Sequence, residues 1–148
     1  MKKYAARFSV RVLLTICSGL IFISSCKKDA QSPDIPYVYV NFSLDPNGTQ
    51  YINLNAVNGW ETVTGGYNGI LLFRKSVEEF MAFERACPYD PRKEGAQVRV
   101  DDSGITCTCP VCGSRFIMTD GTPFAGPSRY PLKQYTTMYD GSLLYVTN

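Results

Sequence analysis

Four cysteines in the second half of the chain carry its clearest potential for chemistry. Cys87 stands alone, whereas Cys107, Cys109 and Cys112 form a Cys-x-Cys-x-x-Cys run. If residues 105–109 form a strand, Cys107 and Cys109 point to one face, and the turn that follows brings the third sulfur back toward Cys109. With Cys87, these thiolates would complete a tetrahedral zinc site. Disulfides are the alternative, because four cysteines permit three pairings and spacing does not choose among them.

The chain contains no histidine. The side chain that most often serves as a general base at neutral pH is therefore missing, and no candidate nucleophile stands in a motif beside a base. The sequence consequently favours a non-enzymatic role without excluding an enzyme. It leaves binding, structural and redox functions open.

The first 25 residues have the layout of a bacterial lipoprotein signal peptide. An interrupted apolar segment leads into Ile23-Ser24-Ser25-Cys26, which resembles a lipobox. This resemblance implies cleavage before Cys26 and lipid on its sulfur, which would hold the protein on a membrane. Cys17 is a poorer candidate because the bulky Ile16 precedes it. The basic residues ahead of the apolar segment are Lys2, Lys3, Arg7 and Arg11.

Residues 26–36 are polar and contain Pro33 and Pro36, so they are expected to form a lipid-anchored tether. Residues 37–148 then have the length of one domain. Without the leader, the chain's 15 basic and 13 acidic residues become a small acidic excess, and no basic patch predicts binding to nucleic acid. We expect an outer-membrane lipoprotein of the cell envelope that faces the periplasm or the surface. Its protein partner is not indicated.

The domain is built from short segments rich in β-forming residues, separated by Gly and Asn turns. This pattern predicts an all-β fold, either an antiparallel β-sandwich or a small barrel. One helical turn is expected at residues 76–79, where Ser76 would cap it and Glu79 follows three residues later. The expected strands are residues 37–42, 51–57, 70–73, 80–84, 98–100, 105–109, 132–136 and 142–146.

The stretch 69–148 resembles a Rieske domain, in which two hairpin loops hold a [2Fe–2S] cluster and each loop supplies one Cys and one His. Cys87 and Cys109 match the two Cys ligands. The resemblance further implies a serine hydroxyl that bonds to cluster sulfur and a proline loop that shields the cluster. The cofactor-binding residues implied in this way are Ser114, Gly126 and Pro127.

Both histidine positions of the Rieske pattern are replaced, the first by Tyr89 and the second by Cys112. The ordinary Rieske ligand set therefore cannot form. The favoured interpretation is a pocket without a cofactor, in which a disulfide between close thiols braces a non-enzymatic binding or structural module. The alternative is a redox or electron-transfer protein in which Cys87, Cys109, Cys112 and Cys107 hold a [2Fe–2S] cluster or Zn²⁺.

Overall fold

The computed structural model describes residues 34–148. The signal peptide expected over residues 1–25, the lipidated Cys26 and most of the tether lie outside the described residues, so these expectations stay predictions. Among the described residues, no helix has both the length and the apolar character needed to cross a membrane.

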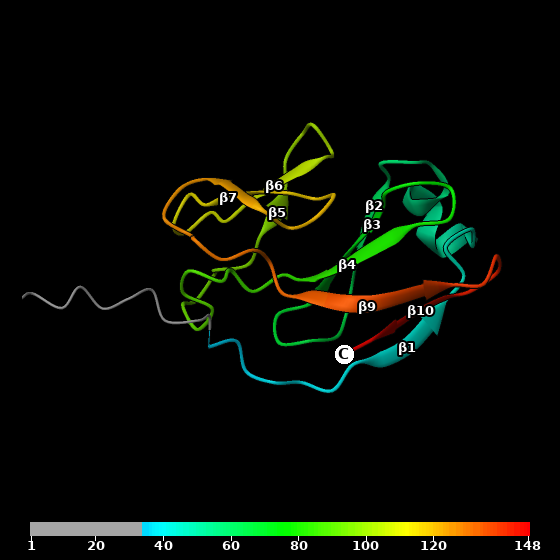
Figure 1. The fold of residues 1–148 in the computed structure, drawn as a ribbon, viewed down its shortest axis with the longest axis horizontal. Helices are drawn as coiled ribbons and strands as arrows, with labels where there is room; N and C mark the ends of the chain where they lie inside the picture. Colours follow the sequence, from blue (N-terminus) through cyan, green and yellow to red (C-terminus); the bar gives the residue numbers. More distant parts are fainter. Residues whose placement is uncertain (1–33) are drawn as a thin grey trace, which may run out of the picture. The chain divides into compact units, whose positions relative to one another are not determined.

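A six-stranded antiparallel sheet forms the larger half of the domain, with strand order β1-β10-β9-β4-β3-β2 (Figure 1). The first strand pairs with the last, so the two ends of the domain lie side by side. The strands of this six-stranded sheet are β1 (Asn41–Leu44), β2 (Trp60–Val63), β3 (Ile70–Arg74), β4 (Phe80–Glu84), β9 (Gln134–Tyr139) and β10 (Leu144–Thr147).

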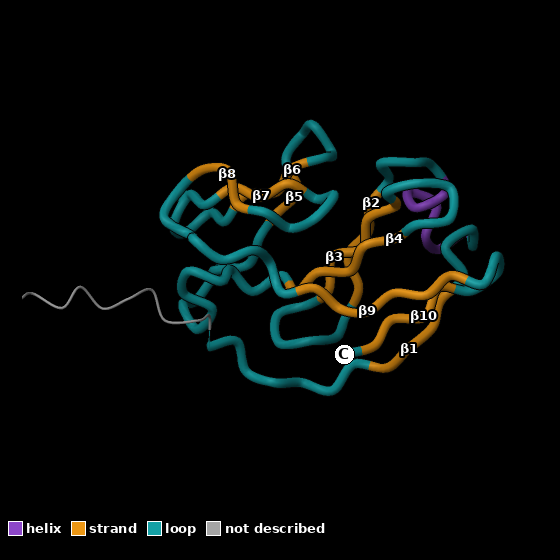
Figure 2. The backbone as a smooth tube through the Cα atoms, viewed as in Figure 1, coloured by secondary structure: helices purple, strands orange, loops and turns teal. Residues whose placement is uncertain are grey.

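A four-stranded antiparallel sheet is inserted in the chain between β4 and β9, and it forms a separate group of strands (Figure 2). Its members, in spatial order, are β5 (Arg99–Val100), β6 (Thr106–Thr108), β7 (Arg115–Ile117) and β8 (Pro123–Ala125). The predicted all-β class is confirmed. The described residues contain one short 3₁₀ helix, η1 (Thr49–Asn55), besides these strands.

Strands β3 and β4 are buried along their whole length, because each face of the sheet packs against a different hydrophobic cluster. Successive strand side chains point to opposite faces, so Leu71 and Phe73 enter one cluster while Ile70 and Leu72 enter the other. The first cluster also contains Val98, Cys107, Phe116 and Met118 from the inserted region. The inserted sheet is thus attached to the larger one through a shared core.

The strand expected at residues 51–57 is wrong, because this segment belongs largely to η1. Its buried side chain is Leu54, and Tyr51 packs against the same cluster. The backbone of Tyr51 is not helical (φ −122°, ψ 37°), so the segment consists of short helical turns joined at a kink. The apparent alternation of apolar residues therefore did not correspond to a strand.

The helical turn expected at residues 76–79 is also wrong, although the capping contact exists. Ser76 Oγ accepts hydrogen bonds from the backbone N–H groups of Glu78 (3.3 Å) and Glu79 (3.0 Å). The N–H of Lys75 donates to the carbonyl of Glu79 at 2.8 Å, which closes the chain into the hairpin between β3 and β4. The paired strand that starts at Phe80 prevents a helix from continuing.

Candidate metal centre

Cys87 lies just beyond the end of β4, where a loop over residues 88–95 leaves the larger sheet. Its backbone N–H donates to the carbonyl of Ala96 at 2.8 Å, and Ala86 forms an isolated bridge with Gln97. These contacts close the base of the loop like a hairpin. They fix the Cys87 side chain at that base, where it is fully buried.

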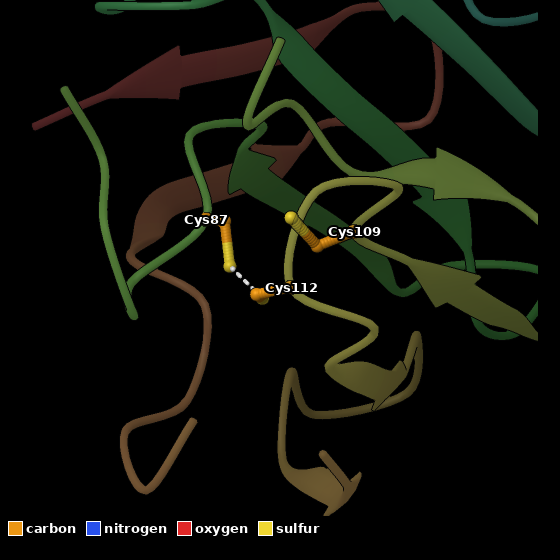
Figure 3. A group of neighbouring side chains, drawn as sticks. All are labelled: Cys87, Cys109 and Cys112. Atoms are coloured by element: carbon orange, nitrogen blue, oxygen red, sulfur yellow. Dashed lines mark hydrogen bonds between the residues drawn. The ribbon is translucent and has the colours of Figure 1, made fainter. Parts of the chain in front are cut away.

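Cys109 and Cys112 lie in the loop between β6 and β7. The Cys109 N–H donates to the Ser114 carbonyl, and the Gly113 N–H donates to the Cys109 carbonyl, both at 2.9 Å. Gly113 has a φ of 73°, a left-handed conformation that glycine adopts without strain. The tight turn therefore places both thiols on the side of the loop that faces Cys87 (Figure 3).

The three sulfurs converge from these two loops. The Sγ atoms of Cys87, Cys109 and Cys112 all lie within 4.8 Å of one another, and those of Cys87 and Cys112 are 3.5 Å apart. Two sulfurs bound at about 2.3 Å to one tetrahedral ion would be separated by about 3.8 Å. The arrangement thus already has the size of the coordination shell of a single metal ion.

The predicted disulfide brace is not supported. Cys87, Cys107, Cys109 and Cys112, the four cysteines of residues 34–148, are all free. The 3.5 Å separation of the Cys87 and Cys112 sulfurs far exceeds the bonded distance of about 2.05 Å. In the described part of the chain, the two loops are therefore held together without a covalent link.

Cys107 does not join the other three sulfurs. It lies in the middle of β6, where its strand partners are Val100 on β5 and Phe116 on β7. It is fully buried in the core shared by the two sheets. The strand expected over residues 105–109 would have placed Cys107 and Cys109 on one face, but β6 ends at Thr108. Both side chains are buried, yet only Cys109 joins the sulfur group with Cys87 and Cys112.

Ser114 links the second loop to the segment that follows β8. Its Oγ accepts a hydrogen bond from the Ser128 N–H at 3.0 Å and lies 3.1 Å from the Cys112 Sγ. Because Ser128 occupies an acceptor position, the Ser114 hydroxyl hydrogen is free to point to Cys112 when that sulfur is a thiolate.

The thiols of the site differ in acidity. Burial raises the pKa of Cys112, but hydrogen bonds from the Ser114 hydroxyl and backbone, and from Cys109 and Cys87, outweigh it and leave the pKa below its ordinary value. Burial raises the pKa of Cys87 well above its ordinary value; the Tyr89 N–H opposes this and the neighbouring thiols add to it. Cys107 has its pKa raised to about 12 by burial and by the nearby charge of Asp101. Of these three thiols, Cys112 therefore loses its proton most readily.

Alkylation of the metal-free protein is expected to label Cys112 before Cys87 and Cys107. The thiolate is the reactive form, Cys112 has the lowered pKa, and it is also more exposed than the other cysteines of residues 34–148. Ser114→Ala should slow the labelling of Cys112 at neutral pH, because the pKa of Cys112 rises when the hydroxyl is removed. Peptide mass spectrometry after timed iodoacetamide treatment measures both effects, and equal labelling of Cys112 and Cys107 would contradict them.

Gly126 and Pro127 lie against the second loop. A Cβ on Gly126 would come within 2.5 Å of the Ser114 Cα and 2.8 Å of the Gly113 carbonyl oxygen. The backbone at Gly126 passes directly over the backbone of Gly113 and Ser114, so only a residue without a side chain fits at position 126. Pro127 lines the pocket beside the sulfurs. The structure thus brings Ser114, Gly126 and Pro127 to the cysteine site.

Gly126→Ala is expected to lower the free energy of unfolding by about 2 kcal/mol more than Gly141→Ala. Both glycines have a left-handed φ, 86° and 94°, but nothing lies within 4 Å of a Cβ built on Gly141. The control therefore carries the backbone strain without the overlap. Chemical denaturation measures the difference. Equal losses of unfolding free energy in the two variants would mean that the backbone at residue 126 moves away from Ser114 at no energetic cost.

A pocket of about 320 Å³ opens beside the sulfurs. Tyr89 lies on its rim with 56% of its surface exposed. Sequence reasoning did not identify Asp90 and Lys93, which also line the pocket, because charged residues in a loop carry no signal of their own. The remaining lining residues are Cys87, Ala96, Cys109, Val111, Cys112 and Pro127.

Glu84 is a second feature that the sequence did not reveal. It is fully buried, and its carboxylate accepts hydrogen bonds from the backbone of Tyr67 (2.6 Å), Asn68 (2.9 Å) and Ala86 (3.0 Å) and from the Tyr135 hydroxyl (2.8 Å). It therefore ties residues 67–68 and Tyr135 of β9 to Ala86, the residue before Cys87. The sequence feature that could have indicated this role is a charged residue at the end of the apolar run 80–84.

No protein-family model matches the sequence, and no curated protein matches it. Solved structures do. The plasma membrane Rieske protein PetC3 from the cyanobacterium Synechocystis PCC 6803 superposes with a TM-score of 0.55 and 18% identity, covering 74% of this chain and 99% of that chain. The ferredoxin of carbazole 1,9a-dioxygenase from Nocardioides aromaticivorans IC177 gives 0.42 and 18%, covering 60% and 83%. A complex of reduced oxygenase and oxidized ferredoxin in carbazole 1,9a-dioxygenase gives 0.48 and 16%, covering 76% and 94%.

The similarity to the Synechocystis protein confirms the predicted Rieske-like fold. It also corrects the expectation that the pocket holds no cofactor, because three unbridged thiols lie together in a fold shared with a Rieske protein. A Rieske [2Fe–2S] centre requires two histidines, and this chain has none. The donor set that is present, three thiolates, fits a thiophilic metal.

Proposed function

We propose that this protein is a lipoprotein of the cell envelope whose Rieske-like domain binds one thiophilic metal ion, such as Zn²⁺, through Cys87, Cys109 and Cys112. The observation that carries the proposal is the convergence of these sulfurs within 4.8 Å of one another. Ligands of the two irons of a [2Fe–2S] cluster stand farther apart than ligands of one ion, because the irons themselves are separated. The compact triad therefore favours a single ion.

The metal content of the purified full-length protein tests this function. One equivalent of metal per chain without inorganic sulfide is expected, and the visible spectrum should lack iron–sulfur bands. A protein that retains no metal after exposure to equimolar Zn²⁺, and whose Cys87 and Cys112 become cross-linked in air, would instead be the disulfide-braced module.

The fold similarity favours a second candidate, an iron–sulfur protein that transfers electrons. In that case Cys87, Cys109 and Cys112 would supply three of the four cluster ligands, and a fourth would come from a residue other than histidine. Two irons and two sulfides per chain, with a reducible chromophore, would establish this candidate and exclude the single ion.

The anchoring part of the proposal is supported by the lipobox, which ends at Cys26. Cys26→Ser is expected to abolish labelling of the protein by radioactive palmitate and to leave the leader uncleaved. Cys17→Ser is the matched control, since it removes a cysteine of the same leader that the peptidase should ignore. Loss of labelling in Cys17→Ser, with retention in Cys26→Ser, would show that the lipid is attached to Cys17.

A further inference from the structure

Among the Cys, Asp and Glu residues of the described chain, three supply ligands to the metal site and no fourth joins them. A tetrahedral ion needs four, but no further Cys, Asp or Glu of residues 34–148 places a ligand atom within the group formed by Cys87, Cys109 and Cys112. Tyr89 directs its backbone N–H at the Cys87 sulfur, while its side chain is more than half exposed. One coordination position is therefore left for a group from outside the chain.

The three cysteines border a space that a ligand would fill. The pocket beside the sulfurs measures about 320 Å³, roughly ten times the volume that one water occupies in the liquid. Ligand sites in proteins begin at about 300 Å³. Val111 and Pro127 give the pocket two apolar walls. The space thus suits a compact organic molecule better than a single water.

Charge selects among such molecules. Lys93 and Asp90 are the charged side chains that line the pocket. The neighbouring Arg92 is paired with Asp34 at 2.7 Å, whereas none of the ion pairs among residues 34–148 involves the Lys93 ammonium group. Lys93 is therefore the cationic side chain of the lining that a ligand carboxylate can approach, and Asp90 places one negative charge in the same lining. The metal, held by three sulfurs, prefers a further soft sulfur donor.

We propose that the fourth position binds a small thiol that carries a carboxylate, with the sulfur on the metal and the carboxylate on Lys93. Binding exchanges ligands without oxidation or reduction: the thiol gives its proton to solvent, the thiolate bonds to the metal, and the metal-bound water leaves. This proposal rests on the three-thiolate metal site proposed above, and it adds the class of molecule that the site receives.

Cobalt substitution tests the proposal in the full-length chain carrying Cys17→Ser and Cys26→Ser, which removes the thiols outside the described residues. Uptake of one Co²⁺ with thiolate charge-transfer absorption is expected first. Absence of Co²⁺ uptake would refute the metal site itself, and the present proposal with it. Normal uptake without a spectral response to any added thiol would refute only the open position.

Mercaptoacetate, 2-mercaptoethanol and acetate are then titrated into the cobalt protein. Both thiols are expected to strengthen the sulfur-to-cobalt absorption, with mercaptoacetate binding at least about five times more tightly, and acetate should have no effect. Lys93→Met should remove the preference for mercaptoacetate while leaving 2-mercaptoethanol unchanged. Equal affinities in the unaltered protein, or an unchanged preference in Lys93→Met, would overturn the role of the carboxylate.

Two further variants ask whether the chain supplies the fourth ligand itself. Tyr89→Phe removes the phenol hydroxyl of Tyr89. Asp90→Asn removes the charge of the carboxylate that lines the pocket. Neither is expected to alter the cobalt spectrum recorded without thiol. A changed spectrum in either variant would identify that residue as the ligand and overturn the proposal.

Discussion

Alanine substitution at any one of Cys87, Cys109 or Cys112 is expected to reduce metal affinity by more than about 100-fold, whereas Cys107→Ala should leave it unchanged. Loss of a hydrogen-bond partner behind a ligand already costs about 10- to 100-fold, and these variants remove a ligand. The three sulfurs form one group within 4.8 Å, from which Cys107 is absent. Competition with a chromophoric chelator measures the four affinities.

Cys107→Ala is a matched control because each of the four variants makes the same change, the loss of one cysteine sulfur. Cys87, Cys107 and Cys109 are all fully buried, so the loss of packing is similar. Unfolding curves recorded without metal should therefore resemble one another while the metal affinities differ. An equal loss of affinity in Cys107→Ala would mean that metal binding depends on core packing and not on the triad.

Glu84→Ala is expected to lower the free energy of unfolding by about 3–5 kcal/mol, since four donors lose their acceptor and each of the two buried ones costs about 1–3 kcal/mol when left unpaired. The donors are three backbone N–H groups and the Tyr135 hydroxyl. Because the Ala86 N–H is among them, metal affinity should fall together with stability. Urea denaturation and the chelator assay measure the two losses.

Glu79→Ala provides the comparison on the surface. Glu79 pairs with Lys75 at 2.6 Å, but its side chain is 53% exposed, and exposed ion pairs contribute less than about 1 kcal/mol. A loss in Glu84→Ala as small as that in Glu79→Ala would show that water replaces the buried carboxylate without cost.

Much of the fold follows from local sequence patterns. The apolar runs at residues 70–73 and 80–84 became β3 and β4, and Asp140-Gly141 joins the last two strands as expected. Residues 51–57 were assigned wrongly because alternation over so short a segment does not distinguish a strand from short helical turns. The burial of Glu84 depends on partners up to 51 residues away, which no local pattern encodes.

The site was predictable in part through a family resemblance. The match of Cys87, Cys109 and Gly113-Ser114 to the Rieske pattern implied two loops that meet, and three of the sulfurs do converge. The separation of Cys107 from them was not predictable, since it depends on where β6 ends. The oxidation state of the thiols likewise depends on distances between loops and not on spacing within one.

The fixed contact of Gly126 with Ser114 has a kinetic consequence. A backbone that passes so closely over the second loop, and is joined to it by the hydrogen bond from Ser128, leaves that flank no room to swing outward. The opposite flank ends in a solvent-exposed tip at residues 92–95. Ions should therefore enter and depart past that tip, and the rate of exchange would follow how often this one segment opens, whatever the stability of the remaining domain.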